Sequence, residues 1–179
     1  MKLLDTPLKG CVIIEPRVFK DHRGSFFESF NQEKFTNLYG EKIDFVQDNQ
    51  SISSYGTLRG LHFQKGEFAQ AKLIRVVSGK VLDVAVDLRE NSSTFAKHFS
   101  VELSGENNLQ LFIPRGFAHG FVCLSEKVIF EYKCDNYYQP SSEAGILYND
   151  PSLNIDWKIP AKDIILSEKD KVLANLKVS

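Results

Sequence analysis

Short stretches in which apolar and polar residues alternate recur along most of the chain. In the stretch 128–134, Val128, Phe130 and Tyr132 share one side, while Ile129 and Glu131 share the other. Because successive side chains of a strand point to opposite faces, this period of two predicts a half-buried strand. Alternating or wholly apolar stretches of this kind predict strands at 11–15, 25–30, 45–51, 58–64, 71–77, 80–88, 98–103, 109–113, 120–124 and 128–134.

The residue types in these stretches favour a mainly β fold. The 14 phenylalanines and 6 tyrosines, against one tryptophan, lie mostly in the predicted strands, where aromatic side chains pack well. Turn-forming sequences such as Ser78-Gly79 separate many of the strands, and no regular helix alternates with them. Many short strands without intervening helices are typical of a sandwich or barrel, and a jelly roll is the expected architecture.

Two short helices are expected beside the strands. Asn31 is a suitable N-cap for a helix that ends near Gly40. Ser167 is a suitable N-cap for a C-terminal helix, whose leucines and valine recur at helical spacing through Leu176. We find no internal repeat or linker, so residues 1–179 are expected to form one domain.

The charge balance argues against several classes of partner. The 22 basic side chains nearly cancel the 23 acidic ones, so no overall field favours nucleic acid or an anionic membrane. Cys11, Cys123 and Cys134 form neither a disulfide framework nor a metal motif, which favours a reducing cytoplasm. No apolar run reaches the roughly 18 residues needed to span a bilayer. The N-terminal residues do not have the pattern of a secretion signal, so we expect a soluble cytoplasmic protein.

The stretch 58–64 contains the first candidate for chemistry. Strict alternation would send Arg59 and His62 to opposite faces of the strand. Gly60 lies between them and is a suitable place for a bulge that would turn both side chains toward one cavity. A histidine among apolar residues is more often a hydrogen-bonded core residue than a catalyst, so this segment alone leaves both alternatives open.

Lys72 and Tyr132 are the next candidates. Lys72 shares a strand face with Ile74 and Val76, and Tyr132 shares one with Phe130. If the face of Lys72 points inward, burial would lower its pKa and suit it to stabilising negative charge; otherwise the ammonium reaches water at the strand's end. An inward Tyr132 either donates to a backbone carbonyl or offers a proton in a pocket.

Asp170, at the start of the predicted C-terminal helix, also has two interpretations. In a capping box, Ser167 would cap the helix and Asp170 would reach back to it. Alternatively, the Asp170 carboxylate would bond a histidine nitrogen, which fixes the tautomer and raises the basicity of the ring. Spacing along the chain does not separate these two interpretations.

Together these segments resemble the dTDP-4-dehydrorhamnose 3,5-epimerase family, a branch of the cupin jelly rolls. The matching motifs cover nearly the whole chain, in the order and spacing of the family. They are FKDHRGSFFE at 19–28, QDNQS at 47–51, LRGLHFQ at 58–64, QAKLIRV at 70–76, IPRGFAHGF at 113–121, YYQP at 137–140 with Glu143, NDP at 149–151, IDW at 155–157 and LSEKD at 166–170.

The resemblance implies a reaction and a catalytic set. The expected substrate is dTDP-4-keto-6-deoxy-glucose, whose carbonyl at carbon 4 acidifies the hydrogens on carbons 3 and 5. Inversion requires a base on one face, an acid on the other and a group that stabilises the enolate. By resemblance, His62 is the base and is oriented by Asp170. Tyr132 is the acid on the opposite face, and Lys72 stabilises the enolate.

The resemblance also implies a set of substrate-binding residues. These are Phe19, Arg23, Glu28, Gln47, Asn49, Arg59, His119, Tyr138, Glu143 and Lys169. Phe19 and Tyr138 are the expected aromatic neighbours of thymine. The arginines suit a pyrophosphate because a guanidinium forms charge-assisted, often bidentate hydrogen bonds. Asp83 is expected to support His119 from behind.

No cofactor and no metal are expected, and the family resemblance implies a homodimer. Pro114-x-Gly116-x-x-His119 is similar to the second cupin motif, but metal-binding cupins add a His-x-His pair where this chain offers only His62. Three alternatives remain at this stage. They are a related enzyme that epimerises carbon 3 only, a jelly-roll sugar-binding module without turnover, and a metal-dependent dioxygenase or isomerase.

Overall fold

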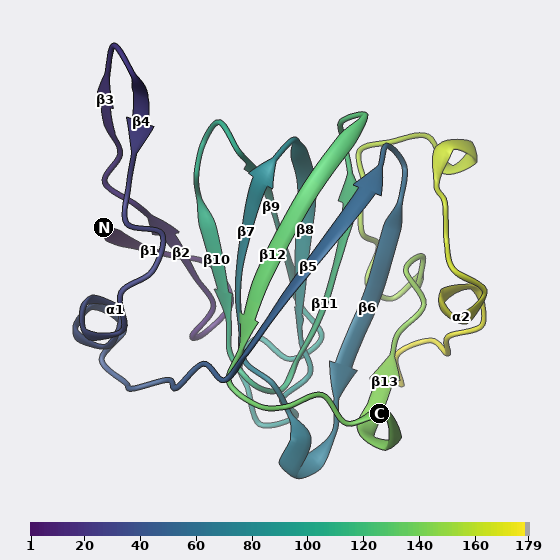
Figure 1. Cartoon of the computed structure of the whole chain (residues 1–179). Coiled ribbons are helices and arrows are strands. Elements are labelled where there is room, and N and C mark those ends of the chain that lie inside the picture. The colour runs from purple at the N-terminus through teal and green to yellow at the C-terminus, as the bar shows by residue number, and fades with distance from the viewer. Residues whose placement is uncertain (178–179) are drawn as a thin grey trace.

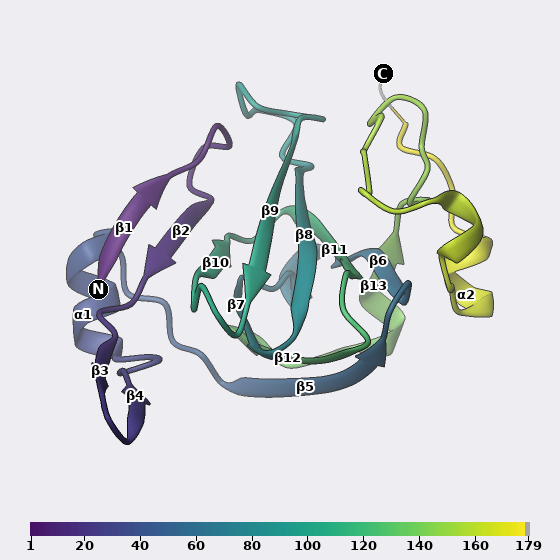
Figure 2. The same cartoon turned by 90° about the horizontal axis from the view of Figure 1, so that it is seen from above.

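Two antiparallel β-sheets face each other, and a short hairpin projects from one side (Figure 1, Figure 2). The computed structural model describes residues 1–177, so the last two residues of the predicted domain, 178 and 179, lie outside it. The six-stranded sheet has the order β1 (Lys2–Asp5), β2 (Val12–Glu15), β10 (Gln110–Ile113), β7 (Lys72–Ser78), β12 (Lys127–Cys134) and β5 (Gln47–Ser54). The five-stranded sheet has the order β13 (Glu143–Gly145), β6 (Leu58–Gln64), β11 (Phe117–Cys123), β8 (Lys80–Asp87) and β9 (His98–Ser104). The hairpin pairs β3 (Phe19–Asp21) with β4 (Gly24–Phe26).

The expected jelly roll is confirmed, and all but one of the predicted strands match an observed strand to within three residues at either end. The exception is the stretch 25–30, of which only the first two residues lie in a strand, β4. Phe30 instead packs against Phe35 and Phe45 on the way into the first helix. Strands β1, β3 and β13 were not predicted, because they are short and none of their residues is buried, so no alternation of buried and exposed positions marks them.

The helices are short, and one of the two predictions is wrong in length. Helix α1 (Gln32–Tyr39) is as expected: the Asn31 side chain accepts from Lys34 N, and Gly40 ends the helix with φ 84°. Helix α2 (Glu168–Lys171) begins at the predicted cap but stops after one turn, well before Leu176. The following backbone bonds elsewhere, and Leu176 N donates to the Asp150 carboxylate. Within residues 1–177 there are also three 3-10 helices: η1 (Gly66–Phe68), η2 (Pro140–Ser142) and η3 (Ala161–Asp163).

The main core lies between the sheets, where Ile74 and Phe130 of one sheet meet Val81 and Phe121 of the other. The rings of Phe121 and Phe130 are stacked, with centroids 3.9 Å apart. Full burial of an apolar side chain of this size stabilises a fold by roughly 1.5–3 kcal/mol. Contacts of this kind hold the two sheets together.

Both outer faces are covered as well. Helix α1 lies on the six-stranded sheet, with Phe35 packed 5.2 Å from Phe112 between ring centroids. Segments that follow β13 cover the five-stranded sheet, and Trp157 packs there in one cluster with Val84. Strands β10 and β11 are consequently buried along their whole length. This explains why their sequences are mostly apolar and do not alternate.

A bulge interrupts the pairing of β6 with β11, as the glycine between Arg59 and His62 predicted. Arg59 lies opposite Phe121 and His62 opposite His119, so three steps along β6 face two along β11. Gly60 has φ 125°, and a Cβ built on it would lie 2.6 Å from Gly120 Cα. The extra residue changes the alternation and turns Arg59 and His62 to the same side.

All three cysteines are buried free thiols. Within the part of the chain that the structure describes, the helices are too short or too polar to cross a membrane.

Replacing Gly60 by Ala should destabilise the protein by at least about 2 kcal/mol, because the added Cβ combines backbone strain with a clash against β11. The matched control is Gly66→Ala, at a glycine with φ 61° whose Cβ would meet nothing within 4 Å. That variant should lose only about 1 kcal/mol. Urea denaturation of both variants measures the difference, and equal losses would contradict the close approach at Gly60.

Candidate active site

A cavity of about 490 Å³ lies between the two sheets. Strands β5, β6, β7, β11 and β12 form its walls, and the segment 165–170 closes the side next to α2. The predicted site residues that line it are Asn49, Arg59, His62, Lys72, His119, Tyr132, Lys169 and Asp170. These residues come from six separate elements, so only the fold brings them together.

His62 and Asp170 form the closest pair in the cavity. The Nε2 atom of His62 is 2.5 Å from Asp170 Oδ1, and the two side chains are 29% and 4% exposed. Asp170 N also donates to Ser167 Oγ at 3.1 Å, so the helix cap exists, but the carboxylate is used for the histidine. Because Nε2 faces the carboxylate, the other ring nitrogen of His62 is left to accept a proton.

Lys72 and Tyr132 lie next to each other on adjacent strands. The Lys72 ammonium is 5.6 Å from the centre of the Tyr132 ring. Burial lowers the pKa of Lys72, and burial raises the pKa of the Tyr132 hydroxyl to about 12. At neutral pH the phenol therefore holds its proton and can act as a donor, beside a cation that can stabilise negative charge.

His119 and Asp83 form a second pair. His119 Nε2 is 3.0 Å from Asp83 Oδ2, and both side chains are almost completely buried. Burial lowers the pKa of His119, although the Asp83 carboxylate acts in the opposite direction. His119 also faces His62 across the β6–β11 pairing. Within residues 1–177, no three His, Cys, Asp or Glu side chains are grouped closely enough to hold a metal ion.

Other predicted binding residues hold one another in place around the cavity. Arg59 Nη2 donates to Oγ of the buried Ser53 at 3.3 Å. At the rim, Glu143 accepts from the Tyr138 hydroxyl at 2.6 Å and pairs with Lys169 at 2.5 Å. Burial would raise the pKa of Glu143, but these two partners lower it overall. The Glu143 carboxylate, at the start of β13, thus stays charged and faces Lys169 of α2. Gln47 lies close by and accepts from Tyr138 N.

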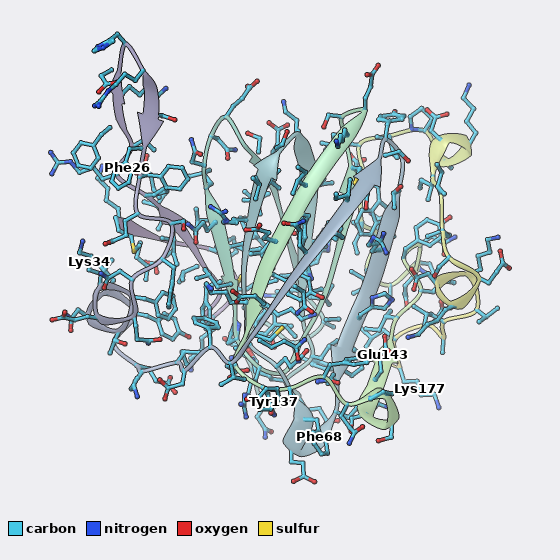
Figure 3. The ribbon with its side chains drawn as sticks, in the orientation of Figure 1. Phe26, Lys34, Phe68, Tyr137, Glu143 and Lys177 are labelled. Atoms are coloured by element: carbon cyan, nitrogen blue, oxygen red, sulfur yellow. The ribbon has the colours of Figure 1, made fainter. Side chains whose placement is uncertain are left out.

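Three predicted residues lie far from this cavity. Phe19 and Arg23 belong to the β3–β4 hairpin, which projects from the opposite side of the molecule from α2 (Figure 1). Arg23 pairs there with Asp21. Glu28 follows the hairpin and pairs with Lys34 at 2.8 Å. Figure 3 shows the same separation, with Phe26 and Lys34 on one side and Glu143 on the other.

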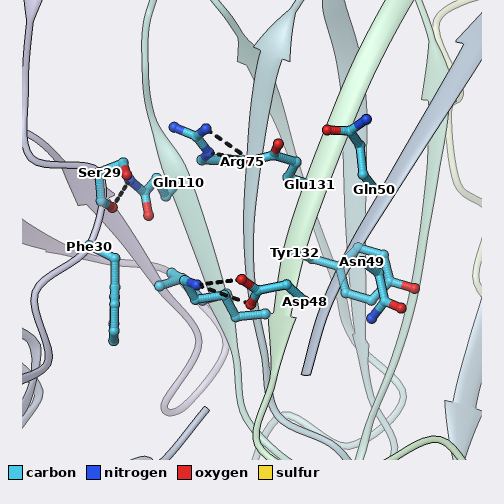
Figure 4. A pocket seen from close by; sticks show the side chains of 11 residues that line it. Ser29, Phe30, Asp48, Asn49, Gln50, Arg75, Gln110, Glu131 and Tyr132 are labelled. Carbon is cyan, nitrogen blue, oxygen red and sulfur yellow. Dashed lines mark hydrogen bonds and ion pairs between the residues drawn. The ribbon is translucent and has the colours of Figure 1, made fainter. Parts of the chain in front are cut away.

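A second cavity, of about 310 Å³, lies on the outer face of the six-stranded sheet (Figure 4). Its charged side chains neutralise one another: Arg75 pairs with Glu131 at 2.9 Å, and Lys133 with Asp48 at 3.0 Å. No histidine or cysteine lines it. Tyr132 borders this cavity too, but both carboxylates here are held in ion pairs. The inner cavity has the histidine–carboxylate pair and is therefore the candidate active site.

Some residues of the inner cavity were not predicted, among them Ser51, Thr57 and Phe121. A signal for Ser51 is present in the sequence. Along β5 the residues that face inward alternate with exposed ones, and the inward set is polar throughout. Polar residues on the inner face of a strand mark a cavity wall rather than a packed core.

A family model described as dTDP-4-dehydrorhamnose 3,5-epimerase matches residues 5–178. The chain belongs to this family. The dTDP-4-dehydrorhamnose 3,5-epimerase of Escherichia coli K12 is 52% identical over 176 residues, which are 98% of this chain and 95% of that one. The corresponding crystal structure from Elizabethkingia anophelis is 60% identical, has a TM-score of 0.94 and covers 98% of this chain and 96% of the other. A Legionella pneumophila dTDP-6-deoxy-D-glucose-3,5-epimerase, in complex with dTDP-4-keto-L-rhamnose, is 46% identical with a TM-score of 0.93, covering 97% and 92% of the two chains.

The expected activity is thereby confirmed. The chain is a dTDP-4-dehydrorhamnose 3,5-epimerase by family, an isomerase that acts on a dTDP-sugar. The alternatives of a binding module without turnover and of a metal-dependent dioxygenase are set aside. The cavity of this epimerase contains the groups that proton transfer requires.

The Tyr132 hydroxyl of the epimerase should stay protonated to beyond pH 10. Its pKa is about 12, because burial disfavours the phenolate, whereas an unperturbed tyrosine titrates near 10. The measurement is an ultraviolet titration of the wild-type chain minus that of Tyr132→Phe. The difference should show no ionisation below about pH 11. A difference signal with its midpoint near pH 10 would show that the hydroxyl is not shielded.

Proposed function

We propose that this epimerase binds dTDP-4-keto-6-deoxy-glucose between its sheets and inverts carbons 3 and 5 with four side chains. They are His62, Asp170, Lys72 and Tyr132. One observation carries the proposal: these residues come from β6, α2, β7 and β12, yet they line one cavity. Each had a structural alternative in isolation, and their convergence favours the catalytic assignment.

The first step removes a proton next to the ketone. The ring nitrogen of His62 that does not face Asp170 takes the proton, and the carboxylate stabilises the imidazolium that forms. The electron pair moves into the carbonyl at carbon 4 and produces an enolate. Lys72 stabilises the negative oxygen, and its burial makes this charge interaction stronger than it would be in water.

The second step returns a proton from the opposite face of the ring. Tyr132 holds its proton at neutral pH, and it stands on the strand next to Lys72. Donation to the carbanion restores the ketone with inverted configuration, and the nearby ammonium stabilises the phenolate that is left. Before the second inversion, His62 must release its proton and Tyr132 must regain one, both by exchange with water. The same two steps then act on the second carbon, because both carbons flank the same carbonyl.

The nucleotide part is assigned to the polar residues that surround the acid–base set. The related Legionella enzyme is seen with dTDP-4-keto-L-rhamnose, which supports a dTDP-sugar in this cavity. We assign the pyrophosphate to Arg59, which lines the cavity as a cation, and we assign Lys169 to the substrate-binding residues at the rim, beside Glu143. His119, Gln47, Asn49, Glu143 and Tyr138 complete the binding set.

We infer further that a second copy of the chain supplies Phe19, Arg23 and Glu28. In one chain these residues lie on or beside the projecting hairpin, away from the cavity. Large apolar side chains are also exposed there: Phe19 is 52% exposed and Phe26 72%. Exposed aromatic residues on a projecting hairpin are suited to burial against another chain. A homodimer in which each hairpin reaches the partner's cavity uses both features.

In deuterated water, the wild-type chain should incorporate deuterium at both carbon 3 and carbon 5 of dTDP-4-keto-6-deoxy-glucose. His62→Asn should lower the exchange rate at both positions by about 10²–10⁴-fold, because it removes the base. Binding of dTDP should change by less than about twofold, since the base does not hold the nucleotide. Nuclear magnetic resonance of the sugar protons and calorimetry measure the two effects.

The matched control is His98→Asn, at a partly buried histidine of β9 outside the cavity, which should leave exchange unchanged. Tyr132→Phe should slow the return of protons more than it weakens binding. Undiminished exchange in His62→Asn would remove His62 as the base. Deuterium at carbon 3 alone in the wild-type chain would instead show a single-site epimerase.

Mixing two inactive variants should restore activity if the hairpin acts on the partner's cavity. Arg23→Ala keeps its own His62, and His62→Asn keeps its own Arg23. In a mixed dimer, one cavity would combine the intact histidine with the intact hairpin of the other chain. After the two variants have exchanged subunits, deuterium incorporation into the sugar should therefore be faster than with either variant alone. Sedimentation of a monomer at micromolar concentration would contradict the dimer, and no recovery in mixed dimers would contradict the contribution of the hairpin to the partner's cavity.

A further inference from the structure

The inward face of strand β5 is a polar stripe, of which Asn49 and Ser51 line the cavity, and Ser51 differs from the other members. The inward residues are Gln47, Asn49, Ser51 and Ser53. Gln47 Nε2 donates to Asn49 Oδ1 at 3.1 Å, and Ser53 Oγ accepts from Arg59. The Ser51 hydroxyl oxygen is buried and has no hydrogen-bond partner among residues 1–177. Ser51 is therefore the member whose hydroxyl the described chain leaves unpaired.

An unpaired buried hydroxyl is unfavourable for the folded protein. A serine in this position loses its hydrogen bonds to water and gains none in return. A structural role would require a partner within the protein or an ordered water, and among residues 1–177 there is no such protein partner. Ser51 also lines the cavity, and rotation about its single side-chain bond can turn the hydroxyl toward a bound molecule. The orphaned hydroxyl thus points to a ligand as its partner.

The neighbours of Ser51 indicate which part of a ligand it would meet. Asn49 lies opposite Tyr132, the proposed acid, and Ser51 lies opposite Phe130. On the other side, Ser53 holds Arg59, which we assign to the pyrophosphate. Inward residues of a strand are about 7 Å apart, so Ser51 stands between the sugar end and the arginine end of the cavity. In a dTDP-sugar, the β-phosphate lies between the keto sugar and the rest of the nucleotide, which is the position that Ser51 faces.

We propose that the Ser51 hydroxyl donates a hydrogen bond to the β-phosphate, the phosphate that carries the keto sugar. Ser51 is then a further substrate-binding residue of this epimerase. The inference rests on the proposed function, since it takes the direction of the substrate from Tyr132 and Arg59. A hydroxyl on a small side chain lets the phosphate approach the strand closely. A charged acceptor makes the hydrogen bond stronger than one between neutral groups.

The test compares two nucleotides that differ by this phosphate. Ser51→Ala should weaken dTDP binding by about tenfold or more, because dTDP retains the second phosphate. Binding of dTMP, which lacks it, should be unchanged. The thermal midpoint of the variant should equal or exceed that of the wild-type chain, since no internal hydrogen bond is lost. Ser54→Ala, on the exposed side of the same strand, is the matched control and should leave the affinities for both nucleotides unchanged.

Each other outcome overturns the assignment. Equal dTDP affinity in Ser51→Ala would show that the hydroxyl does not meet this phosphate, and weaker binding of the intact dTDP-sugar alone would move the contact to the sugar. An equal loss for dTMP and dTDP would place the contact nearer the nucleoside. A marked fall in the thermal midpoint would show a structural hydroxyl. Failure of the proposed function is distinguishable, because a wild-type chain that binds dTDP but exchanges no protons leaves the Ser51 measurement intact.

Discussion

The catalytic arrangement depends on one contact between distant parts of the chain, the 2.5 Å hydrogen bond between His62 and Asp170. Asp170 stands on a single helical turn, which is too short to be stable by itself. Backbone hydrogen bonds hold the segment on both sides of that turn. Ile165 bonds with Gly56 and Leu58 at the start of β6, and Ala174 accepts from Leu147 after β13. The carboxylate is thus attached to the sheet that carries the histidine it orients.

A second constraint is the cost of placing charged groups between two sheets. Most of them are paired: His119 with Asp83, and Arg59 with the hydroxyl of Ser53. Such pairing offsets the desolvation that burial imposes. Lys72 differs, because its close neighbour is the face of the Tyr132 ring. Among the described residues Lys72 has no paired carboxylate, and burial lowers its pKa. Such a lysine is poorly suited to stabilising the fold and well suited to stabilising charge that appears during a reaction.

Local signals predicted the elements well, and the contacts between elements less well. Asn31 and Gly40 belong to one continuous helix motif, and both ends of α1 were predicted correctly. The bulge at Gly60 could be predicted because its signal is local. Arg59 and His62 are three positions apart, so strict alternation would send them to opposite faces unless a bulge lay between them. The two interpretations of Asp170 could not be separated, since its partner is 108 residues away. The length of α2 was overestimated for the same reason: Leu176 N donates to Asp150, a residue that helical periodicity does not reveal.

Proton transfer and part of the nucleotide binding are assigned to different regions of the structure, because the hairpin projects away from the cavity. The proposed acid, base and enolate-stabilising groups all line a cavity within one chain, whereas Arg23 lies on the projecting hairpin. Arg23 is paired there with Asp21 on a surface exposed to water, where an ion pair contributes little to stability. Little stability would therefore be lost if the guanidinium exchanged this carboxylate for a phosphate. Proton transfer, which tolerates only small errors in distance, is assigned to residues that share two sheets. Charge attraction to a nucleotide acts over longer distances, and it can be supplied across an interface.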